Sequence, residues 1–384
     1  MPLALLDFDA VSRNAETLLA PARARRKTIR LATKSLRSPE LIRRVMALDP
    51  GVFRGLMAYA PAEVSALLDD GFDDVLLAYP TCQVPLLREL SRRAAAGRNV
   101  MVMVDDLQHI LALDEACRAG GGVIGVVVDV DMSLRLLRGR VHLGVRRSPV
   151  RDADRALALA EDVLGRRSLR FAGFMGYEAQ VAGLTDAGGS RVDNALKSTV
   201  RALSRRHAAA LRGEISARAR SRGIEVAVFN GGGSGSIDSS SSDDALSEVT
   251  VGSGLLDGHL FDHYSNVSFE PALYFALEVA RRPEIGIVTC AGGGYIASGP
   301  PGRDRLPLPW LPRGLSLLPY EGAGEVQTPL AQRPGVRLRV GDPVFFRHAK
   351  AGELAERFSE YLLLEGDGVS ARLPTYRGLG RCYP

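Results

Sequence analysis

The chain has 384 residues and a formal net charge of +5, with 46% hydrophobic and 24% charged residues and a mean hydropathy near zero. These values are typical of a globular protein built from one large domain and a smaller module. No uncharged apolar run reaches the roughly 18 residues that a membrane-spanning helix needs. The arginines are spread along helices and do not alternate with aromatic residues, which argues against a nucleic-acid-binding protein.

The N-terminus and the cysteines indicate the compartment. The first residues include Asp7 and lack the basic start of a signal peptide. The cysteines form no CxxC pair and no disulfide-like spacing; they are Cys82, Cys117, Cys290 and Cys382. We therefore expect a cytoplasmic protein.

Short apolar runs alternate with amphipathic segments from about residue 29 to residue 262. The strand-like runs are 29–33, 52–58, 74–79, 99–105, 123–131, 141–145, 170–177, 226–232 and 248–252. Helix-like segments lie between them, such as 38–48, where Ser38 and Pro39 mark a helix start. Nearly continuous apolar strands that alternate with helices predict an α/β fold, a parallel (β/α)8 TIM-like barrel. The alternative is a doubly wound open sheet.

After about residue 265 the helical periodicity fades, and proline and glycine gather in 297–314. Short strands recur at 283–289, 336–348 and 361–367, which indicates a β domain. We therefore predict a barrel over 20–264 and a C-terminal β domain over 265–384, joined by N-terminal residues 1–19.

Lysine is scarce in this chain, although Lys and Arg together number 49. The lysines are Lys27, Lys34, Lys197 and Lys350. Only a lysine amine can form an imine with an aldehyde, because a guanidinium stays protonated. Lys34 follows the first predicted barrel strand, at the end where barrel active sites form. We expect a chemical role for Lys34, the alternative being an ordinary lysine at a strand end, and we expect Lys27 and Lys197 to be solvated.

Two glycine–serine turns follow the last two predicted barrel strands. The first, in FNGGGSGSID, contains Gly232, Gly233 and Ser234; the second, in VTVGSGLLDG, contains Gly252 and Ser253. Such turns expose backbone N–H groups and hydroxyls that can surround an anion, and barrels commonly bind phosphate there. A lysine and paired phosphate turns suggest pyridoxal 5′-phosphate, held by an imine at one end and by its phosphate at the other.

These residues resemble a known family. The stretches TKSLRSPEL around Lys34, GFMGYEAQ (173–180), NGGGSGS and EVTVGS are similar to motifs of the fold-type III pyridoxal-phosphate enzymes, the alanine-racemase-like barrels. The similarity is greatest to the D-threonine aldolase and D-serine dehydratase branch. The resemblance implies that Lys34 is the Schiff-base lysine and that Tyr177 lies beside the cofactor ring, unless Tyr177 only packs under a strand. It also implies a homodimer with shared active sites.

One departure concerns the cofactor's ring oxygen. The resemblance implies an arginine before x-Gly-Val on the strand after the acidic strand, but VHLGVRRSP has His142 there. Either His142 or the nearby Arg146 takes this position, or His142 is a hydrogen-bonded core residue.

A second departure concerns metal. Metal-binding members of the family carry His-x-Cys or His-x-Asp in the β domain, whereas this chain has His348 followed by Lys350. An ammonium group cannot ligate a metal. We therefore predict no metal site, the alternative being one that uses Glu353. We expect Lys350 to hold the substrate's β-oxygen and His348, with an ordinary pKa, to accept its proton. Alternatively, Lys350 only neutralises Glu353.

These expectations define one reaction class and its rivals. The chain is predicted to be a pyridoxal-phosphate lyase that cleaves the Cα–Cβ bond of D-β-hydroxy amino acids. The alternatives are a D-serine or D-threonine dehydratase, an amino-acid racemase, and a non-catalytic pyridoxal-phosphate carrier. Trp310, in a proline-rich segment, is expected either to pack or to line the substrate entrance.

Overall fold

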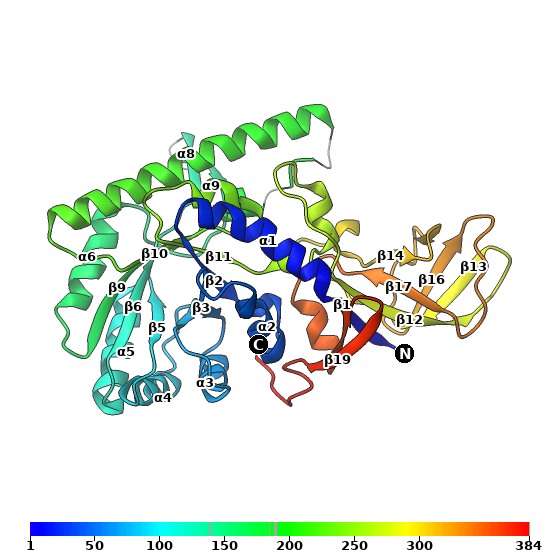
Figure 1. The fold of residues 1–384 in the computed structure, drawn as a ribbon. Helices are drawn as coiled ribbons and strands as arrows, with labels where there is room; N and C mark the ends of the chain where they lie inside the picture. Colours follow the sequence, from blue (N-terminus) through cyan, green and yellow to red (C-terminus); the bar gives the residue numbers. More distant parts are fainter. Residues whose placement is uncertain (138–139, 184, 188–189, 384) are drawn as a thin grey trace. The chain divides into compact units, whose positions relative to one another are not determined.

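The computed structural model describes residues 1–137, 140–183, 185–187 and 190–383 (Figure 1). The chain divides into two compact units. The first comprises residues 1–17, 34–45 and 253–382, and the second comprises residues 18–33 and 46–252 together with Tyr383.

The second unit contains a closed parallel barrel, which confirms the predicted fold class. Within the described residues its strands run in the order β10, β11, β2, β3, β4, β5, β6 and β9. Their bounds are β2 (Thr28–Ala32), β3 (Phe53–Ala58), β4 (Val75–Leu77), β5 (Val100–Val104), β6 (Ile124–Asp129), β9 (Leu169–Gly176), β10 (Val228–Gly231) and β11 (Glu248–Val251). Most of their residues are buried on both faces, as expected of barrel strands covered by helices.

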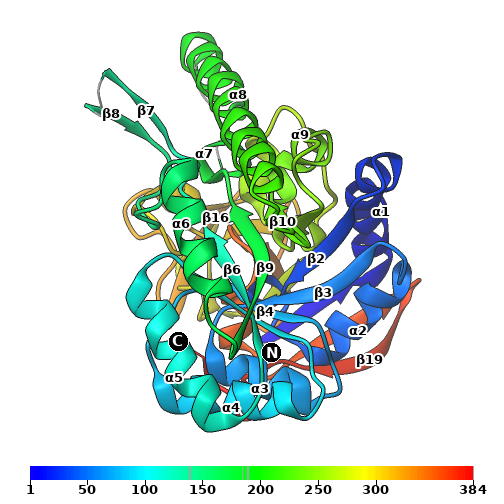
Figure 2. The same cartoon turned by 90° about the vertical axis from the view of Figure 1, so that its left-hand side faces the viewer.

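Helices cover the outside of this barrel, as Figure 2 shows for α3 to α6. Across both units, the helices of the described residues are α1 (Phe8–Ala24), α2 (Pro39–Leu48), α3 (Pro61–Asp69), α4 (Val84–Ala95), α5 (Leu107–Gly120), α6 (Ala153–Leu164), α7 (Ala179–Ala182), α8 (Arg191–Ser221) and α9 (Ile237–Ser241). The predicted start of α2 is confirmed, because the Ser38 hydroxyl accepts a hydrogen bond from the Leu41 N–H and Pro39 opens the helix.

One predicted strand is not part of the barrel. The run at 141–145 forms only β8 (Val141–Leu143), which pairs antiparallel with β7 (Leu134–Leu136) in a separate hairpin. Figure 2 shows this hairpin apart from the barrel strands. Strand β6 instead pairs directly with β9. The physical reason lies in burial: the residues of β8 are exposed or half-buried, whereas barrel strands are buried on both faces.

The first unit is built on a mixed sheet, which confirms the predicted β domain. Its main path runs β15, β16, β13, β12, β1, β18 and β19, while β17 pairs with both β12 and β14. The bounds are β1 (Leu3–Asp7), β12 (Leu273–Arg281), β13 (Ile287–Ala291), β14 (Leu308–Leu311), β15 (Leu315–Leu317), β16 (Gln327–Gln332), β17 (Pro343–Arg347), β18 (Glu360–Glu365) and β19 (Gly368–Pro374). Strand β1 pairs antiparallel with β12 and parallel with β18, so the N-terminal strand belongs to the sheet of the C-terminal part.

Lys27 differs from the solvated residue expected from the sequence. It is buried, and its ammonium donates hydrogen bonds to the carbonyl oxygens of Asp243 and Leu246. Burial lowers the pKa of Lys27. The side chain therefore ties the start of β2 to the segment before β11. In the described part of the chain, no helix is both long and apolar enough to cross a membrane.

Candidate active site

Strands β10, β11 and β2 are neighbours in the barrel, and each leads into one of the segments singled out in the sequence. Gly231 pairs with Val249, and Val251 pairs with Leu31, so the three parallel strands end at the same edge. The turn at 232–236 follows β10, the turn at 252–254 follows β11, and Lys34 comes two residues after β2. This edge is the one at which parallel barrels carry their active sites.

The first glycine–serine turn is held by hydrogen bonds within the second unit. Gly232 has a φ of 78°, a conformation that favours glycine. Its N–H donates to Glu178 Oε2 at 3.1 Å, and the Gly233 N–H donates to Ser236 Oγ at 3.1 Å. The buried Ser234 hydroxyl accepts a hydrogen bond from the Gly252 N–H at 3.3 Å. The two turns are therefore directly joined, and the amides of Gly232 and Gly233 already donate to protein groups.

Tyr177 lies beside this turn, directly after β9. A Cβ atom on Gly233 would lie 2.9 Å from the Ala182 Cβ and 3.4 Å from the Tyr177 Cε2, so a larger residue does not fit. The Arg147 guanidinium carbon lies 5.9 Å from the centre of the Tyr177 ring. The structure thus brings together Tyr177 and the first turn.

The two residues proposed for the ring oxygen lie near the β7–β8 hairpin. His142 is half-buried on β8, with Nε2 at 3.3 Å from the Val145 carbonyl oxygen, and Arg146 is exposed. Arg147, which contacts the Tyr177 ring, was not singled out in the sequence. A run of two arginines gives no indication of which one faces the barrel.

A carboxyl group at the end of β6 was also missed. Burial raises the pKa of Asp129 to about 7, with a further contribution from Asp105, while the charge of Arg147 opposes the rise. Asp105 follows β5, and its own pKa is raised by burial although His109 Nδ1 lies 3.0 Å from its carboxylate. The sequence signal was the acidic ending of the run VVVDVD at 126–131.

Lys34 lies in the first unit, in a 3-10 turn, η1 (Thr33–Ser35), and its side chain is exposed. Its carbonyl oxygen accepts a hydrogen bond from Arg37 Nε at 3.1 Å. The loop that contains Gly352 lies against the same carbonyl group, because a Cβ on Gly352 would be 2.0 Å from the Lys34 oxygen. The carbonyl group of Lys34 thus lies against Gly352, two residues after Lys350 in the chain.

His348 is buried, and its pKa is not that of an ordinary histidine. Its Nδ1 donates to the Leu273 carbonyl oxygen at 3.2 Å, and Nε2 has no hydrogen-bond partner among the described residues. Burial lowers the pKa of His348 to about 3. The expectation of an ordinary pKa is therefore wrong: the imidazole is neutral at physiological pH, and Nε2 is a lone-pair acceptor.

Lys350 is exposed, and its ammonium donates a hydrogen bond to the Ser298 hydroxyl at 3.1 Å. Glu353 accepts a hydrogen bond from the Ser298 N–H at 2.8 Å. The two side chains therefore both contact Ser298, and no direct ion pair joins them within the described ranges. Across those same ranges, no group of three or more His, Cys, Asp or Glu side chains has an arrangement that could hold a metal ion.

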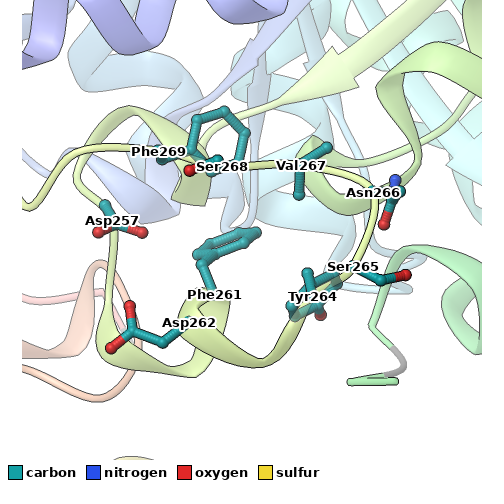
Figure 3. Close-up of a pocket in the computed structure, with 9 residues that line it drawn as sticks. All are labelled: Asp257, Phe261, Asp262, Tyr264, Ser265, Asn266, Val267, Ser268 and Phe269. Carbon is teal, nitrogen blue, oxygen red and sulfur yellow. The ribbon is translucent and has the colours of Figure 1, made fainter. Parts of the chain in front are cut away.

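A pocket of about 310 Å³ in the first unit is lined by none of the predicted site residues (Figure 3). The carboxylates of Asp257 and Asp262 at its edge both pair with the buried Arg347, at 2.9 and 2.8 Å. The rings of Phe261 and Phe269 meet edge to face in its wall. Trp310 packs with its ring 4.8 Å from the guanidinium carbon of Arg347 and 3.4 Å from that of Arg313.

The chain is similar to several solved structures over almost its whole length. D-threonine aldolase from Filomicrobium marinum has a TM-score of 0.83 at 23% identity, with 98% of this chain and 95% of that chain covered. D-threo-3-hydroxyaspartate dehydratase from Delftia sp. HT23 has a TM-score of 0.76 at 17% identity, covering 98% and 97%. Alanine racemase from Clostridium difficile 630 has a TM-score of 0.64 at 13% identity, covering 98% and 99%. No curated protein matches the sequence.

A parallel barrel joined to a β domain is the fold of the fold-type III pyridoxal-phosphate enzymes. Residues 6–256 match the family described as alanine racemase, N-terminal domain. The chain therefore belongs to this family, whose members typically bind pyridoxal phosphate.

Proposed function

We propose that this chain is a lyase that cleaves the Cα–Cβ bond of D-β-hydroxy amino acids by a retro-aldol reaction, with pyridoxal phosphate as its cofactor. One observation carries the proposal: Lys34 follows β2, which pairs with β11, and β11 pairs in turn with β10; β10 and β11 lead into the two glycine–serine turns. An amine and an anion-binding pair of turns at one strand edge suit an aldehyde that bears a phosphate.

The residues present fit that cofactor. Lys34 would hold its aldehyde carbon, and the turns that contain Ser234, Gly252 and Ser253 would hold its phosphate. Gly232 and Gly233 would contribute the shape of the first turn, since their N–H groups donate to Glu178 and Ser236. Tyr177 would lie beside the ring, with His142 or Arg146 toward the ring oxygen. When bound, the cofactor supplies an electron sink for bonds at Cα of an amino acid.

Two side chains after β17 support the choice of a β-hydroxy substrate. The ammonium of Lys350 is exposed and suits an oxygen that becomes anionic. The neutral His348 offers Nε2 as a hydrogen-bond acceptor that can orient a hydroxyl. Because its pKa is low, His348 does not stay protonated at neutral pH. In the proposed reaction the β-hydroxyl loses its proton, the Cα–Cβ bond breaks, the aldehyde leaves, and Cα gains a proton to give glycine.

A dehydratase is the second candidate, supported by the structural similarity to D-threo-3-hydroxyaspartate dehydratase. That reaction removes the Cα proton and expels the β-hydroxyl as water, and the product then hydrolyses to a keto acid and ammonia. The β-oxygen must then leave bound to a proton or to a cation. Lys350 is a cationic side chain two residues after His348. It would bind the β-oxygen in either reaction.

The products distinguish the candidates. We expect the protein reconstituted with pyridoxal phosphate to release glycine and acetaldehyde from D-threonine, and neither product from L-threonine. Release of 2-oxobutyrate and ammonia would instead indicate the dehydratase, and pure interconversion of D- and L-isomers a racemase. Absence of all products from a panel of D- and L-β-hydroxy amino acids, with the cofactor bound, would favour a non-catalytic carrier. Lys34→Ala is the control for contaminating activities.

We further propose, from the resemblance alone, that the chain forms a homodimer in which each β domain contributes to the other subunit's site. Light scattering during size-exclusion chromatography tests this, with a mass of twice 41.2 kDa expected. A monomer that is fully active would contradict the shared site.

A further inference from the structure

Glu178, directly after Tyr177, is fully buried in the second unit and is surrounded by donors. Its Oε2 accepts the Gly232 N–H at 3.1 Å, and its Oε1 accepts the hydroxyls of Ser236 at 3.1 Å and Ser240 at 2.5 Å. The remaining contact is an ion pair with Arg212 from α8. Each of these donors except Arg212 belongs to the first glycine–serine turn or to the short helix α9 behind it.

The charge of Glu178 is compensated inside the protein. Glu178 and Arg212 have 2% and 3% exposed area, and Arg212 also pairs with Asp243 at 2.9 Å and donates to the Gly176 carbonyl oxygen. Although burial opposes ionisation, Arg212 and the hydrogen bonds lower the pKa of Glu178. The carboxylate is therefore ionised and accepts all of these hydrogen bonds.

The turn is arranged around this carboxylate. Gly232 has a positive φ of 78°, and a Cβ there would lie 2.9 Å from the Ser240 Cβ. Ser236 joins the next residue to the same group, because its hydroxyl accepts the Gly233 N–H and donates to Glu178. Two successive amides of the turn are thus fixed by Glu178, one directly and one through Ser236.

We propose that Glu178 is a positioning residue that sets the shape of the turn at 232–236 so that this turn binds the phosphate of the cofactor, and that Glu178 does so without touching the cofactor. This inference rests on the proposed function, because it assumes a phosphate at this turn. With its four donors, Glu178 has its hydrogen-bonding capacity used within the protein. Its contribution therefore acts on phosphate recognition and leaves the reactive amine of Lys34 untouched.

Comparing two ligands distinguishes the proposed role of Glu178 from a purely structural role of the buried ion pair. Pyridoxal has the same aldehyde as pyridoxal phosphate and lacks the phosphate. A general loss of order weakens binding of both compounds alike. A misplaced phosphate turn weakens binding of pyridoxal phosphate alone. The informative quantity is the ratio of the two dissociation constants, measured by absorbance titration of the apoprotein.

We expect Glu178→Gln to reduce the preference for pyridoxal phosphate over pyridoxal by about tenfold or more, as for loss of a charge-assisted hydrogen bond. The matched control is Glu248→Gln, which removes a buried carboxylate paired with Arg30 at 2.7 Å and should leave the ratio unchanged. A ratio unchanged in Glu178→Gln, or reduced equally in Glu248→Gln, would overturn the proposal.

A second variant tests the same proposal if Glu178→Gln does not fold. Ser236→Ala breaks the link between Glu178 and the Gly233 N–H without changing any charge. A reduced ratio in Ser236→Ala supports the proposal, and an unchanged ratio contradicts it. The wild-type chain tests the underlying assumption separately: if it shows no preference for the phosphorylated compound, the proposed phosphate site fails before any variant is compared.

Discussion

The backbone of Gly352 lies directly against the carbonyl group of Lys34, so closely that a Cβ atom at Gly352 would be 2.0 Å from the Lys34 oxygen. Gly352 has a φ of 95° and caps the 3-10 helix η7 (Glu353–Arg357). The loop after β17, which contains His348 and Lys350, is therefore in contact with the segment that presents the proposed Schiff-base lysine.

We expect Gly352→Ala to displace Lys34 and to weaken binding of pyridoxal phosphate strongly. The matched control is Gly341→Ala, because Gly341 has the same φ of 95° and a Cβ there meets nothing within 4 Å. Both positions have a positive φ that alanine rarely adopts, so Gly341→Ala controls for that strain and the difference between the variants reports the contact with Lys34. Cofactor titration of both proteins measures this difference. Equal cofactor affinity would show that the contact does not position the lysine.

The phosphate turns yield a second prediction. The Ser234 hydroxyl joins the two turns through the Gly252 N–H, and Ser253 opens the second turn. Loss of two hydrogen bonds to a charged group, each worth roughly 1.5–3 kcal/mol, should weaken cofactor binding by about a hundredfold or more in a Ser234→Ala, Ser253→Ala double variant. Ser221→Ala at the end of α8, where the hydroxyl donates to the Arg218 carbonyl oxygen, serves as the control. Unchanged cofactor affinity in the double variant would contradict the phosphate assignment.

His348 yields a prediction about stability and pH. The buried imidazole has a folded-state pKa of about 3, whereas in the unfolded chain it titrates near 6.5. The unfolded state therefore binds an extra proton between these values, so the stability contributed above pH 6.5 is lost as the pH falls toward 3. For one proton the slope approaches about 1.4 kcal/mol per pH unit.

We expect His348→Asn to flatten the pH dependence of the free energy of unfolding between pH 7.5 and 5. Urea unfolding at several pH values provides the measurement. His207→Asn, at a half-buried position on α8, should retain the wild-type slope. Parallel profiles for His348→Asn and the wild type would mean that His348 is not held neutral by burial.

The sequence was sufficient for the barrel because its strands are buried on both faces and read as continuous apolar runs. The same argument failed at 141–145, where an apolar run of similar appearance forms the exposed hairpin strand β8. Whether a short run joins the barrel depends on its neighbours in space, which periodicity does not record.

The candidate site was predicted to a different extent at each residue. Lys34 and the glycine–serine turns are visible as a pattern, because their positions follow from strand order. The neutrality of His348 and the burial of Lys27 could not be predicted from the sequence, because both depend on contacts with residues distant in the sequence. Arg147 and Asp129 were missed for the same reason: only the fold brings them into one electrostatic group.

Metal removal tests the prediction that the segment RHAK (347–350) supports a reaction without a metal ion. We expect turnover to survive exhaustive chelation, because the ammonium of Lys350, two residues after His348, cannot ligate a metal ion. Lys350→Met should lower the catalytic rate by about tenfold or more, as for loss of a positioned charge, with the cofactor's absorption intact. Lys197→Met on α8 is the control. Activity that is lost on chelation and restored by manganese or zinc would contradict this role for Lys350.

The most direct test of the central claim is to identify the lysine that carries the cofactor. The protein reconstituted with pyridoxal phosphate is reduced with borohydride, digested, and mapped by mass spectrometry. We expect the pyridoxyl label on Lys34, and Lys34→Ala should lose both the label and the yellow colour of the bound cofactor. A label on Lys350 or Lys27 with none on Lys34, or the absence of any label, would contradict the account.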